Sequence, residues 1–137
     1  MLNLAKIVSI CFLLSACADT PSDTALKPAI IVRGVDSSTR QVVDNYYTVE
    51  PDCSNPGYPE IKVLRMPGHG TVAVENGEAY PSFRQDNVRY DCNKKKVATS
   101  QVSYESVAGF HGKDSFTIQV RYVNSNLRLI TYNIDVI

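Results

Sequence analysis

The C-terminal part of the chain alternates apolar and polar residues with a period of two, and this pattern constrains the fold more than any other feature. The alternation runs through residues 115–122 and returns in residues 130–136. Asn124-Ser125-Asn126, between them, has the composition of a turn. A period of two indicates strands with one buried face. The pattern predicts a terminal β-hairpin with a core face made of Phe116, Ile118, Val120, Tyr122, Ile130, Tyr132, Ile134 and Val136.

Shorter segments upstream show the same alternation. They cover residues 43–49, 71–75, 87–90 and 101–104, and Asn76-Gly77 supplies a hairpin-turn dipeptide after the second of them. In the first segment, Asp44 and Tyr46 fall on the polar face. No window has the 3.6-residue apolar period of an amphipathic helix. About seven short strands, divided by Gly, Pro and Asn, predict an all-β domain, a β-sandwich, over residues 30–137.

Residues 1–16 resemble the signal peptide of a bacterial lipoprotein. A start containing Lys6 precedes an apolar run that is shorter than the roughly 20 residues of a membrane-spanning helix. Leu14-Ser15-Ala16-Cys17 resembles the lipobox, in which the cysteine is lipidated and becomes the first residue after cleavage. The resemblance implies a membrane anchor at Cys17 and, because Ala18 rather than aspartate follows, delivery to the outer membrane. Residues 17–29 are then a lipidated cysteine and a flexible tether.

The N-terminal segment and the cysteines each allow a second interpretation. Ala16 and Ala18 also satisfy the pattern of an ordinary signal peptidase, which would release a protein without Cys17. If Cys17 carries lipid and Cys11 leaves with the signal peptide, Cys53 and Cys92 remain as an even pair in an oxidising compartment. They are predicted to form a disulfide. A reactive or metal-binding thiol pair is the alternative, but there is no C-x-x-C spacing and no nearby histidine.

Three segments in order resemble bacterial cadherin-like and immunoglobulin-like repeats. These are Val43-Asp44-Asn45-Tyr46-Tyr47-Thr48-Val49, Pro67-Gly68-His69-Gly70-Thr71-Val72 and Gly109-Phe110-His111-Gly112-Lys113-Asp114-Ser115-Phe116-Thr117. The resemblance covers residues 41–137. It implies a Greek-key β-sandwich that acts in adhesion, surface architecture or ligand display. Members of this family often bind calcium through aspartate-rich runs, and this chain has no such run, so no metal is predicted.

Few residues offer catalytic chemistry. His69 and His111 lie in glycine-flanked turns, where a structural role competes with a metal site or a catalytic base paired with Asp114. Two histidines fall short of the four ligands of a structural metal site. No serine lies in a G-x-S-x-G elbow. We expect no catalytic residue and no cofactor, and we expect Asp114 to accept hydrogen bonds from turn N–H groups.

The expected function is therefore binding, adhesion or a structural role in the cell envelope. A formal net charge of zero gives no basic excess for nucleic acid. The predicted contact residues are Tyr58, in the loop 52–60, and Lys94, Lys95 and Lys96, in the loop 91–98. Another envelope or extracellular macromolecule is the expected partner.

Two further interpretations remain open. Tyr46, Tyr47, Tyr58 and Tyr80 form either an exposed contact patch or half-buried positions of a sheet. Tyr90-Asp91-Cys92, followed by Val102-Ser103-Tyr104, is similar to the tyrosine-x-cysteine strand of small lipoproteins that inhibit lysozyme. An inhibitor of a hydrolase is thus the alternative function, although the Ser-Gly-x-x-Tyr loop of those inhibitors is absent.

Overall fold

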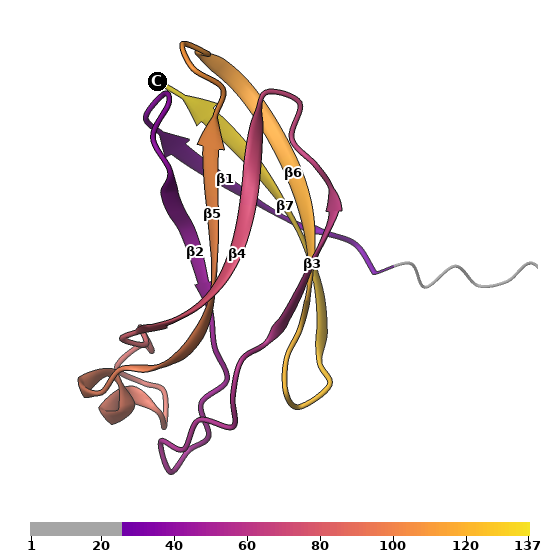
Figure 1. Cartoon of the computed structure of the whole chain (residues 1–137). Coiled ribbons are helices and arrows are strands. Elements are labelled where there is room, and N and C mark those ends of the chain that lie inside the picture. The colour runs from indigo at the N-terminus through magenta and orange to yellow at the C-terminus, as the bar shows by residue number, and fades with distance from the viewer. Residues whose placement is uncertain (1–25) are drawn as a thin grey trace, which may run out of the picture.

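Two β-sheets stack face to face in the computed structural model, which describes residues 26–137 (Figure 1). One sheet has the order β1 (Ala29–Val35), β7 (Leu127–Val136), β6 (Gly112–Arg121) and β3 (Glu60–Arg65). The other has the order β2 (Gln41–Tyr46), β5 (Val97–Ser106) and β4 (Gly70–Ala79). A single 3-10 turn, η1 (Tyr90–Lys94), precedes β5.

Apart from β1, which lies beside β7, the strand order is that of an immunoglobulin-like Greek-key sandwich. The chain crosses between the sheets after β1, β2, β3 and β5, and only β4–β5 and β6–β7 follow each other within one sheet. β1 runs parallel to β7, and all other pairs are antiparallel. The predicted all-β class, strand number and architecture are confirmed. The predicted signal peptide, Cys17 and most of the predicted tether lie outside the described residues. Residues 26–137 contain no helix that is long and apolar enough to span a membrane.

The terminal hairpin forms as the alternation predicts. Phe116 pairs with Tyr132 and Ile118 with Ile130, and all four side chains are buried. The Phe116 ring stacks between Tyr104 and Tyr132, with ring centroids 6.1 and 4.9 Å away. On the outer face, the hydroxyl groups of Thr117 and Thr131 are 2.9 Å apart. The inner face of this hairpin and the inner face of β5 make the main core.

Two local predictions are wrong. Asn76-Gly77 lies inside β4, where Gly77 pairs with Thr99, because β4 follows β5 along its full length instead of turning back. A Cβ on Gly77 would meet the Gln101 side chain at 2.7 Å, so glycine lets that amide lie across the strand. Residues 87–90 form turns that lead into η1, with Tyr90 N–H donating to the Asn87 carbonyl, and the Val88 side chain is 76% exposed.

A β-bulge in β2 overturns a third prediction. The pairing with β5 shifts between Val42 and Asp44, and this shift turns Asp44 and Tyr46 towards the core. Asp44 Oδ2 accepts a hydrogen bond from the Tyr132 hydroxyl at 2.9 Å and lies 3.3 Å from Arg33 Nη2. The Tyr46 and Tyr132 hydroxyl groups are hydrogen-bonded to each other. Burial raises the pKa of both tyrosines, which therefore stay neutral at any physiological pH.

Candidate functional site

Three connections lie together at one end of the sandwich. They are residues 47–59, 80–96 and 122–126, and we call them the disulfide end (lower part of Figure 1). Cys53 and Cys92 form a disulfide between the first two connections, with their Cα atoms 5.3 Å apart, which confirms the predicted bond. Cys92 is buried in a small second core with Val49 and Val97. The bond therefore fixes two loops to each other and to the sandwich.

Two asparagine side chains hold these loops where no strand ladder exists. Asn55 Nδ2 donates to the Thr48 carbonyl at 2.6 Å, and Asn55 Oδ1 accepts from Ala98 N–H at 3.2 Å. Asn93 exchanges two hydrogen bonds, of 2.9 and 2.8 Å, with the backbone of Phe83. The loops thus have a defined conformation that places their exposed side chains.

The predicted contact residues all lie at the disulfide end. Tyr58 is 47% exposed. Lys94 Nζ is 2.9 Å from Asp91 Oδ1, and Lys96 Nζ is 5.7 Å from the centre of the Tyr80 ring. Lys95 is exposed. The disulfide joins the two loops that carry these residues, but among the described residues no hydrogen bond or cation–π contact links Tyr58 to the lysines.

The suggested patch of four tyrosines divides into two groups. Tyr46 is buried in the main core and Tyr47 is half-buried. These two tyrosines therefore do not belong to an exposed contact patch. Tyr58 and Tyr80 are exposed, and Tyr90 joins them. Tyr90-Asp91-Cys92 lies in η1, so it does not form the strand that the resemblance to lysozyme inhibitors implies.

A groove opens beside these loops, between the ends of the two sheets. It consists of two adjoining hollows of about 450 and 290 Å³ that share Tyr47, Tyr122 and Arg128. Tyr47 meets Phe83 edge to face, with ring centroids 5.8 Å apart. Arg89 donates from Nε to the Val49 carbonyl at 2.6 Å. We call this feature the aromatic groove.

Apart from Tyr46 and Tyr47, which belong to the suggested tyrosine patch, none of the groove residues was assigned to a site from the sequence. Phe83 and Arg89 come from the loop 80–96, and Tyr122 and Arg128 from the hairpin. One signal was present: Arg128 occupies the first inner position of the series that continues as Ile130, Tyr132 and Ile134. Its pairing with Val120, which is fully buried, confirms that inner position. The alternation thus places the Arg128 guanidinium where the space between the two sheets opens to solvent.

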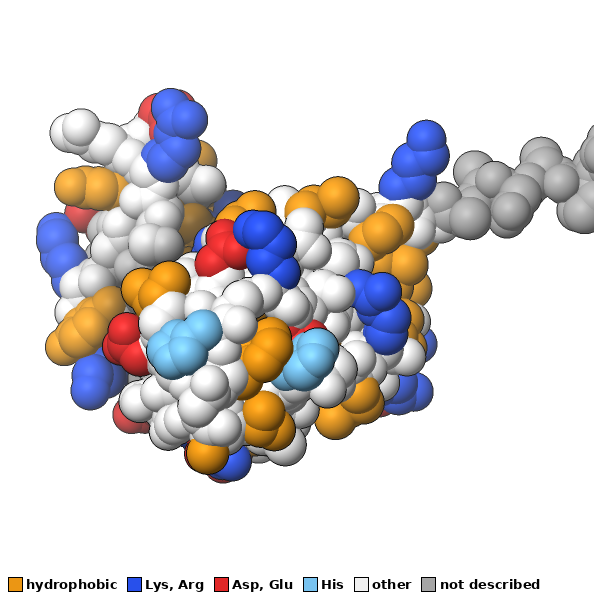
Figure 2. Space-filling view, turned by 90° about the horizontal axis from the view of Figure 1, so that it is seen from above, with side chains coloured by type: hydrophobic (Ala, Val, Ile, Leu, Met, Phe, Trp, Pro, Cys, Tyr) orange, Lys and Arg blue, Asp and Glu red, His pale blue; other side chains and the backbone are white. Residues whose placement is uncertain are grey.

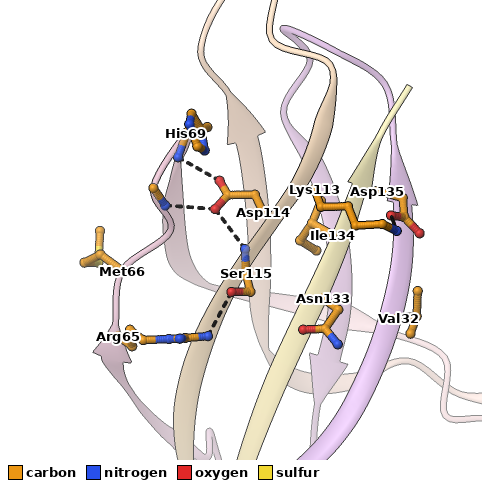
Figure 3. Close-up of a pocket in the computed structure, with 11 residues that line it drawn as sticks. Val32, Arg65, Met66, His69, Lys113, Asp114, Ser115, Asn133, Ile134 and Asp135 are labelled. Carbon is orange, nitrogen blue, oxygen red and sulfur yellow. Dashed lines mark hydrogen bonds and ion pairs between the residues drawn. The ribbon is translucent and has the colours of Figure 1, made fainter.

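A separate hollow, of about 620 Å³, lies on the outer face of β6 and β7 near the opposite end (Figure 3). Its charged side chains have partners within the chain, and one pair among them is an ion pair. Arg65 donates to Ser115 Oγ at 2.8 Å, and Lys113 Nζ is 2.6 Å from Asp135.

Asp114 links two of the three segments that resemble cadherin-like repeats, residues 67–72 and residues 109–117. Its Oδ1 accepts from the N–H groups of Gly68 and Ser115, both at 2.8 Å, and its Oδ2 accepts from His69 N–H at 2.9 Å and the Tyr104 hydroxyl at 2.8 Å. Partial burial acts to raise the pKa of Asp114, but these hydrogen bonds together hold it below its usual value. The expected turn-binding role of Asp114 is confirmed.

The His69 side chain packs against an aromatic ring. The His69 ring stacks on Phe110 with centroids 4.3 Å apart and planes 5° from parallel. Both histidines are visible at this end of the molecule in Figure 2. Within residues 26–137, no three His, Cys, Asp or Glu side chains are grouped as metal ligands would be.

No protein-family model, curated protein or solved structure matches this chain. The functional inference therefore depends on the residues described above.

Proposed function

We propose that this chain is a non-enzymatic lipoprotein of the bacterial cell envelope, anchored in the outer membrane through lipid on Cys17. The lipobox-like Leu14-Ser15-Ala16-Cys17 after a short apolar run supports the anchor. The Cys53–Cys92 disulfide agrees with an oxidising compartment, since cytosolic proteins rarely keep such bonds. The single immunoglobulin-like sandwich then serves as a binding module held off the membrane by its tether.

One observation supports a binding role at the disulfide end. The three exposed tyrosines of residues 26–137 all lie there: Tyr58, Tyr80 and Tyr90. Tyrosine is enriched at protein interfaces because it combines a large apolar ring with a polar tip. The adjacent Lys94-Lys95-Lys96 run adds positive charge. We propose that this surface contacts another envelope or extracellular macromolecule.

The lipid anchor can be tested by metabolic labelling with an alkyne fatty acid. The wild-type chain should be labelled, and Cys17→Ser should not, because serine cannot form the thioether. Cys11→Ser is the matched control, since that thiol lies inside the apolar run and should leave with the signal peptide. Equal labelling of wild type and Cys17→Ser would refute the anchor.

The binding surface can be tested on a partner captured from the envelope with the full chain. Tyr58→Ala combined with Lys95→Glu should weaken binding at least tenfold, about 1.4 kcal/mol. Val107→Ala combined with Lys113→Glu is the control, because both side chains are exposed at the opposite end of the sandwich. Equal weakening by both double variants would contradict the proposed surface. A captured hydrolase whose turnover stops on binding would instead establish the inhibitor alternative.

A further inference from the structure

The aromatic groove holds positive charge that no carboxylate of the described chain neutralises. Within residues 26–137, neither Arg89 nor Arg128 forms an ion pair. Asp44 is the one acidic residue in the described walls, and its carboxylate is already bound by Arg33 and Tyr132. The groove is therefore complementary to an anion. Arginine is the side chain best suited to a carboxylate because its planar fork can donate two parallel hydrogen bonds.

The same walls contain buried polar atoms without partners. In residues 26–137 three buried side-chain oxygens lack a hydrogen-bond partner, and two of them, Asn45 Oδ1 and Thr48 Oγ1, belong to residues that line the groove. Thr48 is only 8% exposed. Buried polar groups are nearly always satisfied in folded proteins, so an unsatisfied group calls for a specific cause. The walls of the groove thus include two oxygens whose hydrogen-bonding capacity no group of residues 26–137 uses.

The rest of the groove combines aromatic rings with amides. Tyr47, Phe83 and Tyr122 supply rings, and Asn124 and Asn126 supply amide groups at the hairpin turn. Ligand sites typically place a few oriented polar groups among apolar and aromatic side chains. Flat rings suit the C–H faces of a sugar, and amides suit its hydroxyl groups. The groove thus offers positive charge, aromatic rings and amide groups, and a sugar chain that bears carboxylates can contact all three.

An extended peptide is the less suitable occupant. A peptide would bind most simply by adding a strand to the edge of β2, which borders the groove. Arg33 Nε already donates to the Val43 carbonyl at 3.0 Å, and the bulge between Val42 and Asp44 breaks the regular edge. Both features oppose strand addition.

The geometry points to an acidic saccharide, a sugar chain that bears carboxylate groups, as the ligand of the aromatic groove. Arg128 binds the carboxylate, the aromatic rings contact the sugar faces, and the asparagines bind hydroxyl groups. This assignment rests on the proposed binding function, since it names the ligand class of one part of the disulfide end. The disulfide positions the site, because Phe83 and Arg89 belong to the loop that Cys92 ties to Cys53.

The test uses the mature lipidated chain in detergent and measures binding by isothermal titration calorimetry. The probe is trigalacturonate, with neutral galactotriose and an acidic tripeptide as comparison ligands. Trigalacturonate should bind at least tenfold more tightly than either. Arg128→Gln should weaken this binding at least tenfold, and Arg128→Lys should weaken it less because it keeps the charge. Arg121→Gln, an equal loss of charge on the outer face of β6, should leave it unchanged.

Each contrary result has a definite meaning. Equal binding of galactotriose, tighter binding of the tripeptide, equal effects of Arg128→Gln and Arg121→Gln, or no binding of trigalacturonate at millimolar concentration would each overturn the assignment. Circular dichroism checks that Arg128→Gln is folded, and Asn126→Ala provides a second variant that should weaken binding. If a captured partner still depends on Tyr58 and Lys95 while trigalacturonate does not bind, the proposed function stands and only the saccharide assignment fails.

Discussion

At the scale of single residues, Asp114 shows what a sequence can and cannot reveal. Its place after a glycine-rich turn predicts an acceptor for backbone N–H groups, and that role is confirmed. The sequence does not reveal that two of its donors are Gly68 and His69, which lie on a different loop. It also does not reveal the Tyr104 hydroxyl. Such long-range partners follow from the fold and not from local spacing.

Asp114→Ala should lower the free energy of unfolding by roughly 2 kcal/mol, because four donors lose a charged acceptor. Asp114→Asn should cost less, since one side-chain oxygen can still accept. Urea denaturation at pH 7 measures both changes. Lys113→Ala, which removes an exposed ion pair with Asp135, is the control and should cost under about 1 kcal/mol. A loss for Asp114→Ala no larger than for this control would show that the carboxylate does not hold the loops.

At low pH, Asp114 should stabilise the folded state no more than asparagine does at the same position. The folded state lowers the pKa of Asp114, so its stabilisation is fully present above the unfolded value of about 3.9 and is lost as pH falls through the folded value. The stability difference between wild type and Asp114→Asn should therefore shrink between pH 5 and pH 2. Asp52, whose pKa is also lowered, is present in both proteins and does not affect the comparison. A difference that is constant with pH would contradict the assigned hydrogen bonds.

At the scale of elements, prediction succeeded where a strand is regular and failed where it is interrupted. The hairpin β6–β7 has unbroken alternation, and its inner residues are buried as expected from 116 to 120 and from 130 to 136, whereas Tyr122 is only half-buried. In β2, one extra residue at the bulge reverses the faces, so Asp44 and Tyr46 turn inwards. The alternation at residues 87–90 is too short to compete with the turn hydrogen bonds of that loop. Period-two patterns are informative only when pairing continues without a bulge.

Phe116→Ala tests the hairpin register. The side chain is fully buried between two tyrosine rings, so its removal should cost about 3–5 kcal/mol in unfolding free energy. Thr117→Ala, on the outer face of the same strand, loses the contact with Thr131 and should cost less than half of that. Chemical denaturation of both variants gives the comparison. Equal costs would mean that the strand faces are assigned wrongly.

At the scale of the whole molecule, the fold class and the disulfide could be predicted, but the aromatic groove could not. The strand count, the turn residues and the even cysteine pair are local or countable features. The groove draws on residues near 47, 83, 89, 122 and 128, and only the crossing of the chain between the sheets brings them together. No spacing in the sequence encodes that proximity. The inward position of Arg128 was the one local sign of it.

Reduction of the disulfide should destabilise the domain and affect the two loops that it joins more than the β6–β7 hairpin. Cys53 and Cys92 are 39 residues apart, and a closed loop of that length stabilises by roughly 4 kcal/mol on the chain-entropy model. The reduced chain should unfold at visibly lower urea concentration. The small core of Val49, Cys92 and Val97 also depends on the bond, so amide hydrogen exchange should accelerate first in residues 47–59 and 80–96. The β6–β7 hairpin should keep its protection until global unfolding, because its core contains no cysteine. Uniform acceleration across both regions, or an unchanged urea midpoint, would show that the bond does not organise the disulfide end.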